Sequence, residues 1–121
     1  MTIYKKLEAW KRSMLLVMEV YELVKYFPKE EQFSLTSQTK RAAISVPANI
    51  AEGIGRNSRK DSIRFLIISR GSLYELETLL DISKMILLIR EDQLQKICEL
   101  IDVCLKLING LIKHFEKELN K

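Results

Sequence analysis

The sequence predicts an all-α protein, an antiparallel up-down-up-down four-helix bundle in which residues 1–121 form a single domain. Apolar residues recur at three- and four-residue spacing in four segments, which is typical of helices that bury one face. Proline, glycine and serine residues separate these segments, and no sequence repeat links them. With 47% hydrophobic and 30% charged residues, the composition is that of a folded domain rather than a disordered chain.

The first helix is expected from about Leu7 to Tyr26, where Pro28 follows and prevents its continuation. Its apolar residues recur at alternating three- and four-residue steps, which predicts the face that packs inside a bundle. The residues predicted on that face are Leu7, Trp10, Met14, Val17, Tyr21 and Val24.

The second helix is expected to begin near Leu35 and to contain Pro47, which removes one backbone hydrogen bond and predicts a kink. We expect Gly53 and Gly55 to end it, because glycine adopts the left-handed conformation common at helix C-termini. Small and apolar residues predict its buried face, namely Ala42, Ala43, Val46, Ile50 and Ala51.

The third helix is expected to run from Ser58 to about Ile89, with Ser58 capping it and Asp61 three residues later. Gly71 and Ser72 are small residues inside this helix and predict a close crossing with another backbone. Two apolar stripes follow it, which is more apolar surface than one neighbouring helix covers. The first contains Leu66, Leu73, Leu76, Leu80 and Leu87, and the second contains Phe65, Ile68, Leu79, Ile82 and Ile86.

The fourth helix is expected to begin near Asp92, with Gln95 completing a capping pattern. Its predicted buried positions are Leu94, Ile97, Ile101, Cys104, Ile108, Leu111 and Phe115, and Leu100, Leu107 and Ile112 widen that face. Short connections make consecutive helices antiparallel. The additional apolar surface on the third and fourth helices predicts a homo-oligomer, and the alternative is a monomer with a larger core.

Positive charge is concentrated in the middle of the sequence. The whole chain has a net charge of +4, but residues 40–70 contain seven cations against only Glu52 and Asp61. The seven candidate nucleic-acid-binding residues are Lys40, Arg41, Arg56, Arg59, Lys60, Arg64 and Arg70. Arginine suits bidentate contacts with phosphate, and the glycine-containing turn adds exposed amides at a helix N-terminus. The alternative interpretation is a solvated face with carboxylate partners.

Catalytic and cofactor patterns are incomplete. Gly53 and Gly55 lack the further residues of a dinucleotide-binding or P-loop motif, and His114 lacks the glutamate that di-metal bundle sites place three residues earlier. Glu75 and Glu77 point about 200° apart on a helix and cannot act as one carboxylate pair. We therefore expect no enzyme activity, cofactor or metal. Reduced cysteines and the lack of a signal or membrane segment predict a cytoplasmic protein without a membrane partner.

Most of the sequence resembles a known bacterial family. The strongest resemblance lies in residues 35–38, 40–43 and 45–53 and in Arg56, and it continues through Leu7, Trp10, Tyr21, Phe27, Pro28, Glu31 and residues 65–78. These residues resemble the four-helix-bundle proteins encoded in intervening sequences of bacterial large-subunit (23S) ribosomal RNA genes. That family is similar to the accessory variability proteins of diversity-generating retroelements, which are homopentamers that bind nucleic acid and a reverse transcriptase.

The resemblance implies a ring-shaped homopentamer with RNA or DNA, a reverse transcriptase or another protein as partner. Within its motif, Asn49 and Glu52 are expected to satisfy backbone groups beside Pro47 or to pair with Arg41 or Arg56, and the alternative is ligand contact. Glu75 and Glu77 are expected to face different neighbours. The sequence thus supports a non-enzymatic oligomeric scaffold that binds nucleic acid with little sequence specificity. The alternative is an oligomeric protein-interaction module that binds no nucleic acid.

Overall fold

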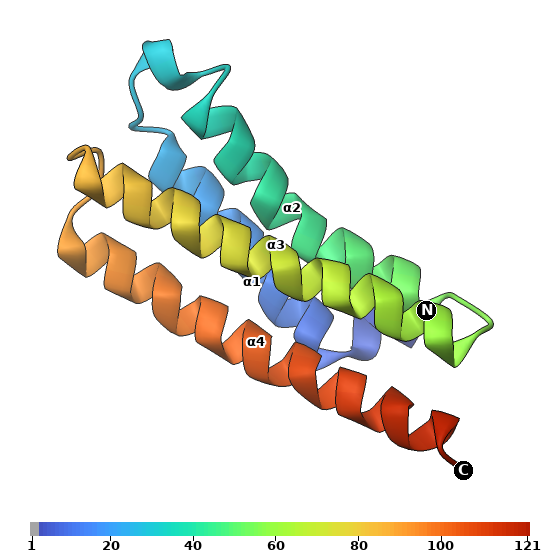
Figure 1. The fold of residues 1–121 in the computed structure, drawn as a ribbon. Helices are drawn as coiled ribbons and strands as arrows, with labels where there is room; N and C mark the ends of the chain where they lie inside the picture. The colour runs from blue at the N-terminus through green and yellow to red at the C-terminus, as the bar shows by residue number, and fades with distance from the viewer. Residues whose placement is uncertain (1–2) are drawn as a thin grey trace.

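A computed structural model describes residues 3–121, and this range forms a four-helix bundle without strands. The helices are α1 (Glu8–Val24), α2 (Leu35–Ile54), α3 (Arg59–Met85) and α4 (Glu91–Leu119), with short 3-10 helices η1 (Ile3–Lys6) and η2 (Lys29–Glu31). Each long helix packs against the next in the chain, and α4 closes the bundle against α1. The α2–α3 turn and both ends of the chain lie at one end of the bundle (Figure 1).

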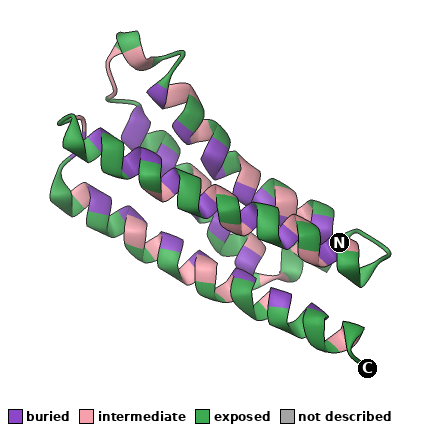
Figure 2. Ribbon diagram, in the orientation of Figure 1, coloured by how far each residue is buried: buried purple, intermediate pink, exposed green. Residues whose placement is uncertain are grey.

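The core runs along the whole bundle axis and contains aliphatic side chains from all four helices (Figure 2). The largest fully buried side chains include Leu16, Ile50, Leu66, Leu73, Leu76, Leu80, Ile101 and Ile108. Burying one such side chain contributes about 1.5–3 kcal/mol, so this core is the main source of stability. The up-down-up-down fold predicted from the apolar pattern is confirmed.

The predicted buried face of α1 is correct for Val24, and Trp10 and Val17 are half-buried against the core, but the centre of the face is displaced by about one residue. The buried residues of α1 are Ala9, Ser13, Leu16, Val20, Leu23 and Val24. Met14 and Tyr21, both predicted inside, are exposed. Apolar residues cover more than half of this helix, so its periodicity fits two neighbouring faces equally well. The observed face includes the small residues Ala9 and Ser13, which the apolar pattern did not mark as buried.

Helix α2 begins at Leu35 as predicted and continues through Pro47 to Ile54. Polar side chains connect it to α3 near this proline. The Ser45 and Ser72 hydroxyl groups are 2.7 Å apart, and the Ser69 hydroxyl donates to the Val46 carbonyl oxygen at 2.8 Å. Asn49 donates from its side chain to the Ser45 carbonyl oxygen at 2.8 Å. Asn49 thus bonds a backbone group beside Pro47, but not the Ala43 carbonyl that the proline deprives of an amide partner, and Ser72 joins two helices.

The glycines behave differently from the expectation. Helix α2 ends at Ile54 with Gly55 as its C-cap residue, where the sequence predicts the end, but the φ of Gly55 is −79° and therefore not left-handed. Gly53 instead permits close packing, because a Cβ atom there would lie 3.0 Å from both Phe65 Cβ and the Ser62 carbonyl oxygen. At Gly71 no atom lies within 4 Å of the corresponding position. The close crossing predicted at Gly71 is therefore found at Gly53 within the subunit.

Helix α3 begins as predicted, with the Ser58 hydroxyl accepting a hydrogen bond from the Asp61 amide at 3.3 Å. It ends at Met85, earlier than the predicted Ile89. Leu66, Leu73, Leu76 and Leu80 of the first stripe are buried, but Leu87 lies beyond the helix and is exposed. In the second stripe Leu79 is buried, whereas Ile68, Ile82 and Ile86 are exposed. The predicted excess of apolar surface on α3 is thus present.

Helix α4 begins at Glu91, and its cap differs from the expected pairing of Asp92 with Gln95. The Gln93 side chain accepts a hydrogen bond from the Arg90 amide at 2.9 Å. The predicted buried face is correct except that Ile112 replaces Leu111 as its buried residue in the last turns. Leu100 and Leu107 are half-buried against the core, so the subunit itself covers much of the additional apolar surface of α4.

Candidate nucleic-acid interface

Charge is distributed unevenly along the bundle axis. The end that carries both termini and the α2–α3 turn consists of residues 3–12, 52–64 and 113–121, which we call the basic end. These three segments contain eleven Lys or Arg residues and five Asp or Glu residues, a net charge of +6. The rest of the protein has a net charge of −2. The four-helix fold therefore converts a mild overall excess of cations into a strongly polarised molecule.

Two arginines and a phenyl ring form an organised group at the basic end. The guanidinium groups of Arg56 and Arg64 each lie 4.6 Å from the centroid of the Phe65 ring. Each also has a carboxylate nearby, with Arg56 Nη2 3.7 Å from Glu52 and Arg64 Nε 3.6 Å from Asp61. These exposed, long contacts contribute little to stability. Both guanidinium groups therefore lie over one ring, and neither forms a short ion pair with its carboxylate.

Among Arg56, Arg59, Lys60 and Arg64, Lys60 is the cation most available to a ligand. It is exposed and forms no ion pair with any residue in the range 3–121. It lies in the first turn of α3, where the unpaired amides and the helix dipole favour an anion. Asp61 in the same turn offsets part of that effect.

Arg59 has a structural position instead. Its Nε is 2.7 Å from a Glu118 carboxylate oxygen, and its guanidinium lies 4.9 Å from the centroid of the Phe115 ring. Both partners are on α4, so Arg59 connects the start of α3 to the end of α4. This geometry fits the alternative hypothesis, in which arginines of the cluster form salt bridges.

The structure does not bring Lys40, Arg41 and Arg70 to the basic end. Lys40 lies on α2 with its ammonium 4.8 Å from the centroid of the Tyr21 ring of α1. Arg41 is exposed on the same helix. Arg70 lies on α3 and donates from Nη1 to the Asn109 side-chain oxygen of α4 at 3.0 Å. The seven predicted cations therefore separate into one cluster of four and three scattered residues.

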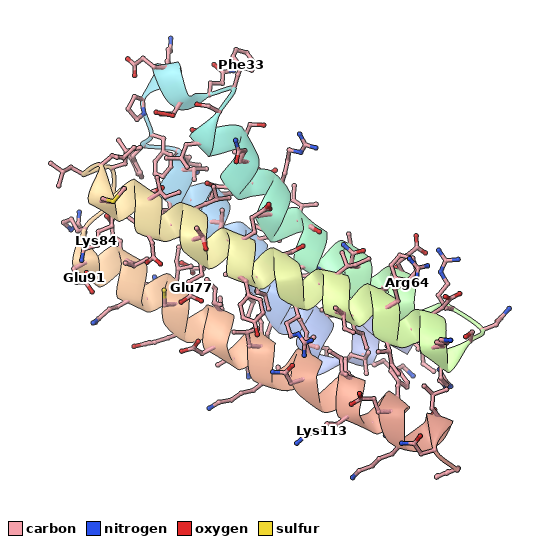
Figure 3. All side chains as sticks on the ribbon, viewed as in Figure 1. Phe33, Arg64, Glu77, Lys84, Glu91 and Lys113 are labelled. Atoms are coloured by element: carbon pink, nitrogen blue, oxygen red, sulfur yellow. The ribbon has the colours of Figure 1, made fainter. Side chains whose placement is uncertain are left out.

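Other cations join the basic end from distant parts of the sequence. The N-terminal segment contributes Lys5, Lys6, Lys11 and Arg12, the last turns of α4 contribute Lys113 and Lys117, and Lys121 follows that helix. Figure 3 shows Arg64 and Lys113 in the same half of the bundle, on α3 and α4. These residues are not among the predicted cations because they are far in sequence from residues 40–70. The predicted antiparallel order already implied that both termini meet the α2–α3 turn.

The remaining motif residues have ordinary surroundings. Glu52 pairs with Arg56 as expected, Pro47 is buried, and Gly53 is buried in the α2–α3 contact. Glu75 is exposed and Glu77 is half-buried, which agrees with their different directions on α3. His114 is exposed and lies 3.1 Å from Glu118.

The described residues contain neither a cluster of metal ligands nor a cysteine with a lowered pKa. No group of three or more His, Cys, Asp or Glu side chains within residues 3–121 is arranged to hold a metal ion. Burial is the main cause that raises the pKa of the Cys98 and Cys104 thiols above the usual value, so both are protonated at neutral pH. None of the helices in residues 3–121 combines the length and apolar character needed to cross a membrane.

Fold and surface together define a small four-helix-bundle protein with one basic end. The family described as 23S rRNA-intervening sequence protein matches residues 5–110, and the protein therefore belongs to that family. This confirms the resemblance noted in the sequence. No protein of curated function matches the chain.

A solved structure supports the same assignment. The protein is similar to a protein of unknown function from the S23 ribosomal protein family of Bacteroides thetaiotaomicron VPI-5482, whose crystal structure was determined at 1.70 Å resolution. The two chains are 25% identical and superimpose with a TM-score of 0.80. The match covers 87% of this chain and 98% of the other.

Proposed function

We propose that the protein is a non-enzymatic, oligomeric scaffold that binds RNA or DNA through its basic end, with little sequence specificity. The observation that carries the proposal is the net charge of +6 gathered at one end of the bundle. Phosphate is the group that such a surface attracts, and phosphate contacts carry no information about base sequence. Arg56, Lys60 and Arg64 form the centre of the proposed contact.

Self-association is supported by apolar side chains on the outer surfaces of α1 and α3. Met14 and Met18 on α1 and Ile68 and Ile82 on α3 are exposed in the subunit. Burying such side chains against other subunits would be favourable. A ring of side-by-side bundles with cyclic symmetry would bring every basic end to the same rim. The ring, including the homopentamer that the family resemblance implies, would then multiply the charge that a nucleic acid meets.

Salt dependence is the decisive measurement. Binding of a fluorescently labelled, mixed-sequence single-stranded RNA should weaken as salt rises, with a log–log slope of about −0.7 for each phosphate neutralised. Replacing Lys60 with Gln should weaken binding and reduce the slope by about one such step. The matched control is Lys29→Gln, because Lys29 is exposed at the opposite end and forms no ion pair within residues 3–121.

Three outcomes would contradict the proposal. These are the absence of binding at low salt, binding that does not change with salt, and equal effects of the Lys60 and Lys29 substitutions. A parallel titration with duplex DNA and with single-stranded DNA distinguishes the preferred nucleic acid.

The second candidate is a protein-interaction module without nucleic-acid binding, and the Arg59 contact with Glu118 favours it. Under this alternative the arginines hold the subunit or the oligomer together. Reversing the charge of Arg59 and Arg64 would then dissociate or destabilise the oligomer, while the parent protein would bind no RNA at low salt. Light scattering on parent and variant, with and without RNA, separates the two functions.

A further inference from the structure

The end of the bundle opposite the basic end has a different surface. It consists of the α1–α2 connection (residues 25–34) and the α3–α4 connection (residues 86–90), and we call it the apolar end. Three large side chains there are almost fully exposed, namely Tyr26 at 83%, Phe33 at 90% and Leu87 at 88%. Phe33 projects from the α1–α2 connection away from the helices (Figure 3). Isolated exposed apolar residues are common, but several at one end of a small domain indicate an interaction surface.

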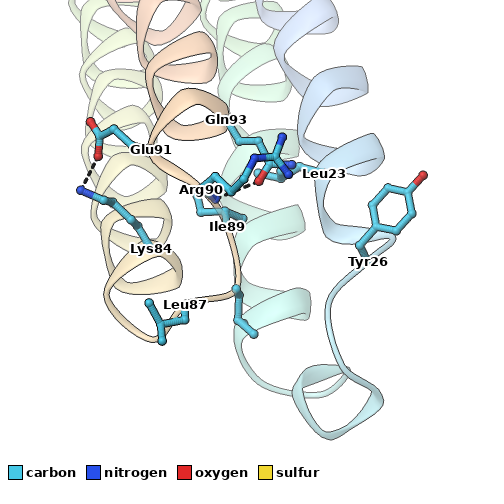
Figure 4. A pocket seen from close by; sticks show the side chains of 9 residues that line it. Leu23, Tyr26, Lys84, Leu87, Ile89, Arg90, Glu91 and Gln93 are labelled. Atoms are coloured by element: carbon cyan, nitrogen blue, oxygen red, sulfur yellow. Dashed lines mark hydrogen bonds and ion pairs between the residues drawn. The ribbon is translucent and has the colours of Figure 1, made fainter.

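The apolar end also contains a hollow of about 610 Å³ between the last turn of α1 and the α3–α4 connection. Its lining includes Leu23, Leu88 and Ile89, and Leu87 and Tyr26 stand on opposite sides of it (Figure 4). The same surface therefore carries projecting side chains and a cavity of a size that could receive them.

Leu87 is held outward by an unfavourable backbone conformation. Its φ is +67°, and it is the one non-glycine residue with positive φ within residues 3–121. The Leu88 amide donates to the Ser83 carbonyl oxygen at 2.8 Å and the Leu87 amide donates to that of Lys84 at 3.0 Å, which is the Schellman ending of a helix. Glycine usually occupies this position because a Cβ atom makes it costly. The leucine side chain does not compensate for that cost within the subunit, since it is exposed.

Most charged groups beside the hollow are paired with one another, whereas Lys29 and Glu30 on the α1–α2 connection form no ion pair within residues 3–121. Lys25 Nζ is 2.8 Å from a Glu22 carboxylate oxygen, Arg90 Nε is 3.0 Å from Asp92, and Lys84 pairs with Glu91. The two connections and the adjoining helix turns thus present a nearly neutral, salt-bridged rim around apolar side chains. Such a surface does not attract a polyanion, and it does not repel an identical copy.

We propose that two copies of the protein associate through their apolar ends, with Leu87 of each copy entering the hollow of the other. A surface that carries both the projection and the receiving cavity is self-complementary, which is the property of a two-fold symmetric interface. The net charge of +6 opposes the reverse arrangement, in which basic ends would meet. Paired in this way, the two basic ends face outward in opposite directions. This contact is separate from the side-by-side contacts of a ring.

Leu87→Gly is the informative variant, because it removes the projecting side chain and relieves the backbone strain. Light scattering should show that the variant has half the mass of the parent protein at the same concentration. The melting temperature of the parent should rise with protein concentration, as expected for subunits that stabilise one another. The part of this rise that comes from the contact between apolar ends should be absent in the variant. At the lowest concentration the variant should melt at or above the parent temperature.

Leu87→Asn should behave like the glycine variant, because asparagine also tolerates the left-handed conformation and is polar. Leu119→Ala is the matched control, since Leu119 is an exposed leucine at the basic end and its removal should leave the mass unchanged. An unchanged mass for Leu87→Gly would overturn the proposal, and so would a lower melting temperature at the lowest concentration. RNA binding per subunit should persist in the variant, which separates this test from the proposed function.

Discussion

The connections before and after α3 differ in backbone conformation and in the side chains around them. Gly53 in the last turn of α2 and Gly55 in the α2–α3 turn lie at the start of α3, yet neither has a positive φ. The α3–α4 connection at its end contains no glycine, yet Leu87 adopts the left-handed conformation. Gly53, just before the first connection, provides space for a close helix contact, whereas at the second connection a strained leucine is exposed to solvent. The first connection is surrounded by cations and the second by apolar side chains.

This comparison indicates two surfaces with separate tasks. A side chain that is costly to hold in place and makes no contact in the subunit is more easily explained by an external contact than by folding. The cations of the basic end also contribute little to folding, because few of them have buried partners. An external contact is therefore the simpler explanation for them as well. Substitutions at the two ends should therefore have different consequences.

The largest effect on folding is expected for Gly53→Ala. The added Cβ atom would lie 3.0 Å from Phe65 Cβ and from the Ser62 carbonyl oxygen, and the second of these is a backbone atom that cannot rotate away. Overpacking of this kind costs about 1–3 kcal/mol. Urea denaturation followed by circular dichroism measures it. A variant as stable as the parent would show that the α2–α3 contact is loose, and the contrast between the two connections would disappear.

A smaller loss is expected for Arg59→Ala, which removes the ion pair with Glu118 and the contact with Phe115. Both groups are partly exposed, so the pair and the ring contact together should contribute about 1 kcal/mol. Lys25→Ala at the apolar end is the comparison, because Lys25 pairs only with Glu22 on its own helix and should change the melting temperature very little. Equal effects of the two substitutions would contradict the structural role assigned to Arg59.

Much of the fold could be predicted from the sequence because local signals and packing agree in most segments. Ser58 and Asp61 mark the start of α3, and the apolar periodicity of α4 identifies nearly all of its buried residues. On α1 the periodicity allowed two faces, and the observed one includes the small residues Ala9 and Ser13, which an apolar pattern does not mark. The conformation of Leu87 could not be foreseen, because the residue preferences of helix ends favour glycine there.

The candidate site was predicted less completely, because closeness in the sequence differs from closeness in space. Arg56, Lys60 and Arg64 are close in sequence and form a cluster in space. Lys40 and Arg70 are also within the basic segment of the sequence, but the length of the helices carries them away from the turn. Lys5 and Lys113 are far from that segment, yet the antiparallel fold brings them to the same end.

A modest gain in stability is expected for Gly71→Ala, the counterpart of the Gly53 substitution. Nothing lies within 4 Å of the new Cβ atom in the subunit, and alanine favours a helix over glycine by about 0.5–1 kcal/mol. Denaturation of the subunit measures the gain, and light scattering tests the assembly. If the variant has a smaller mass than the parent, Gly71 lies in a contact between subunits. If it is less stable at constant mass, the open space around Gly71 is contradicted.

The smallest effect is expected from acid titration at the apolar end. A hydrogen bond from the Arg90 side chain is the main cause that lowers the pKa of the Asp92 carboxyl below its usual value of 3.8. The unfolded chain therefore binds a proton at a higher pH than the folded protein, and the pair stabilises the fold fully above that pH. Its contribution is lost as the pH falls through the lowered pKa. Titration of the Asp92 carboxyl carbon by NMR should show the low midpoint in the parent and a return toward 3.8 in Arg90→Gln. An unchanged midpoint would mean that the rim of the apolar end is not salt-bridged there, which would weaken its contrast with the basic end.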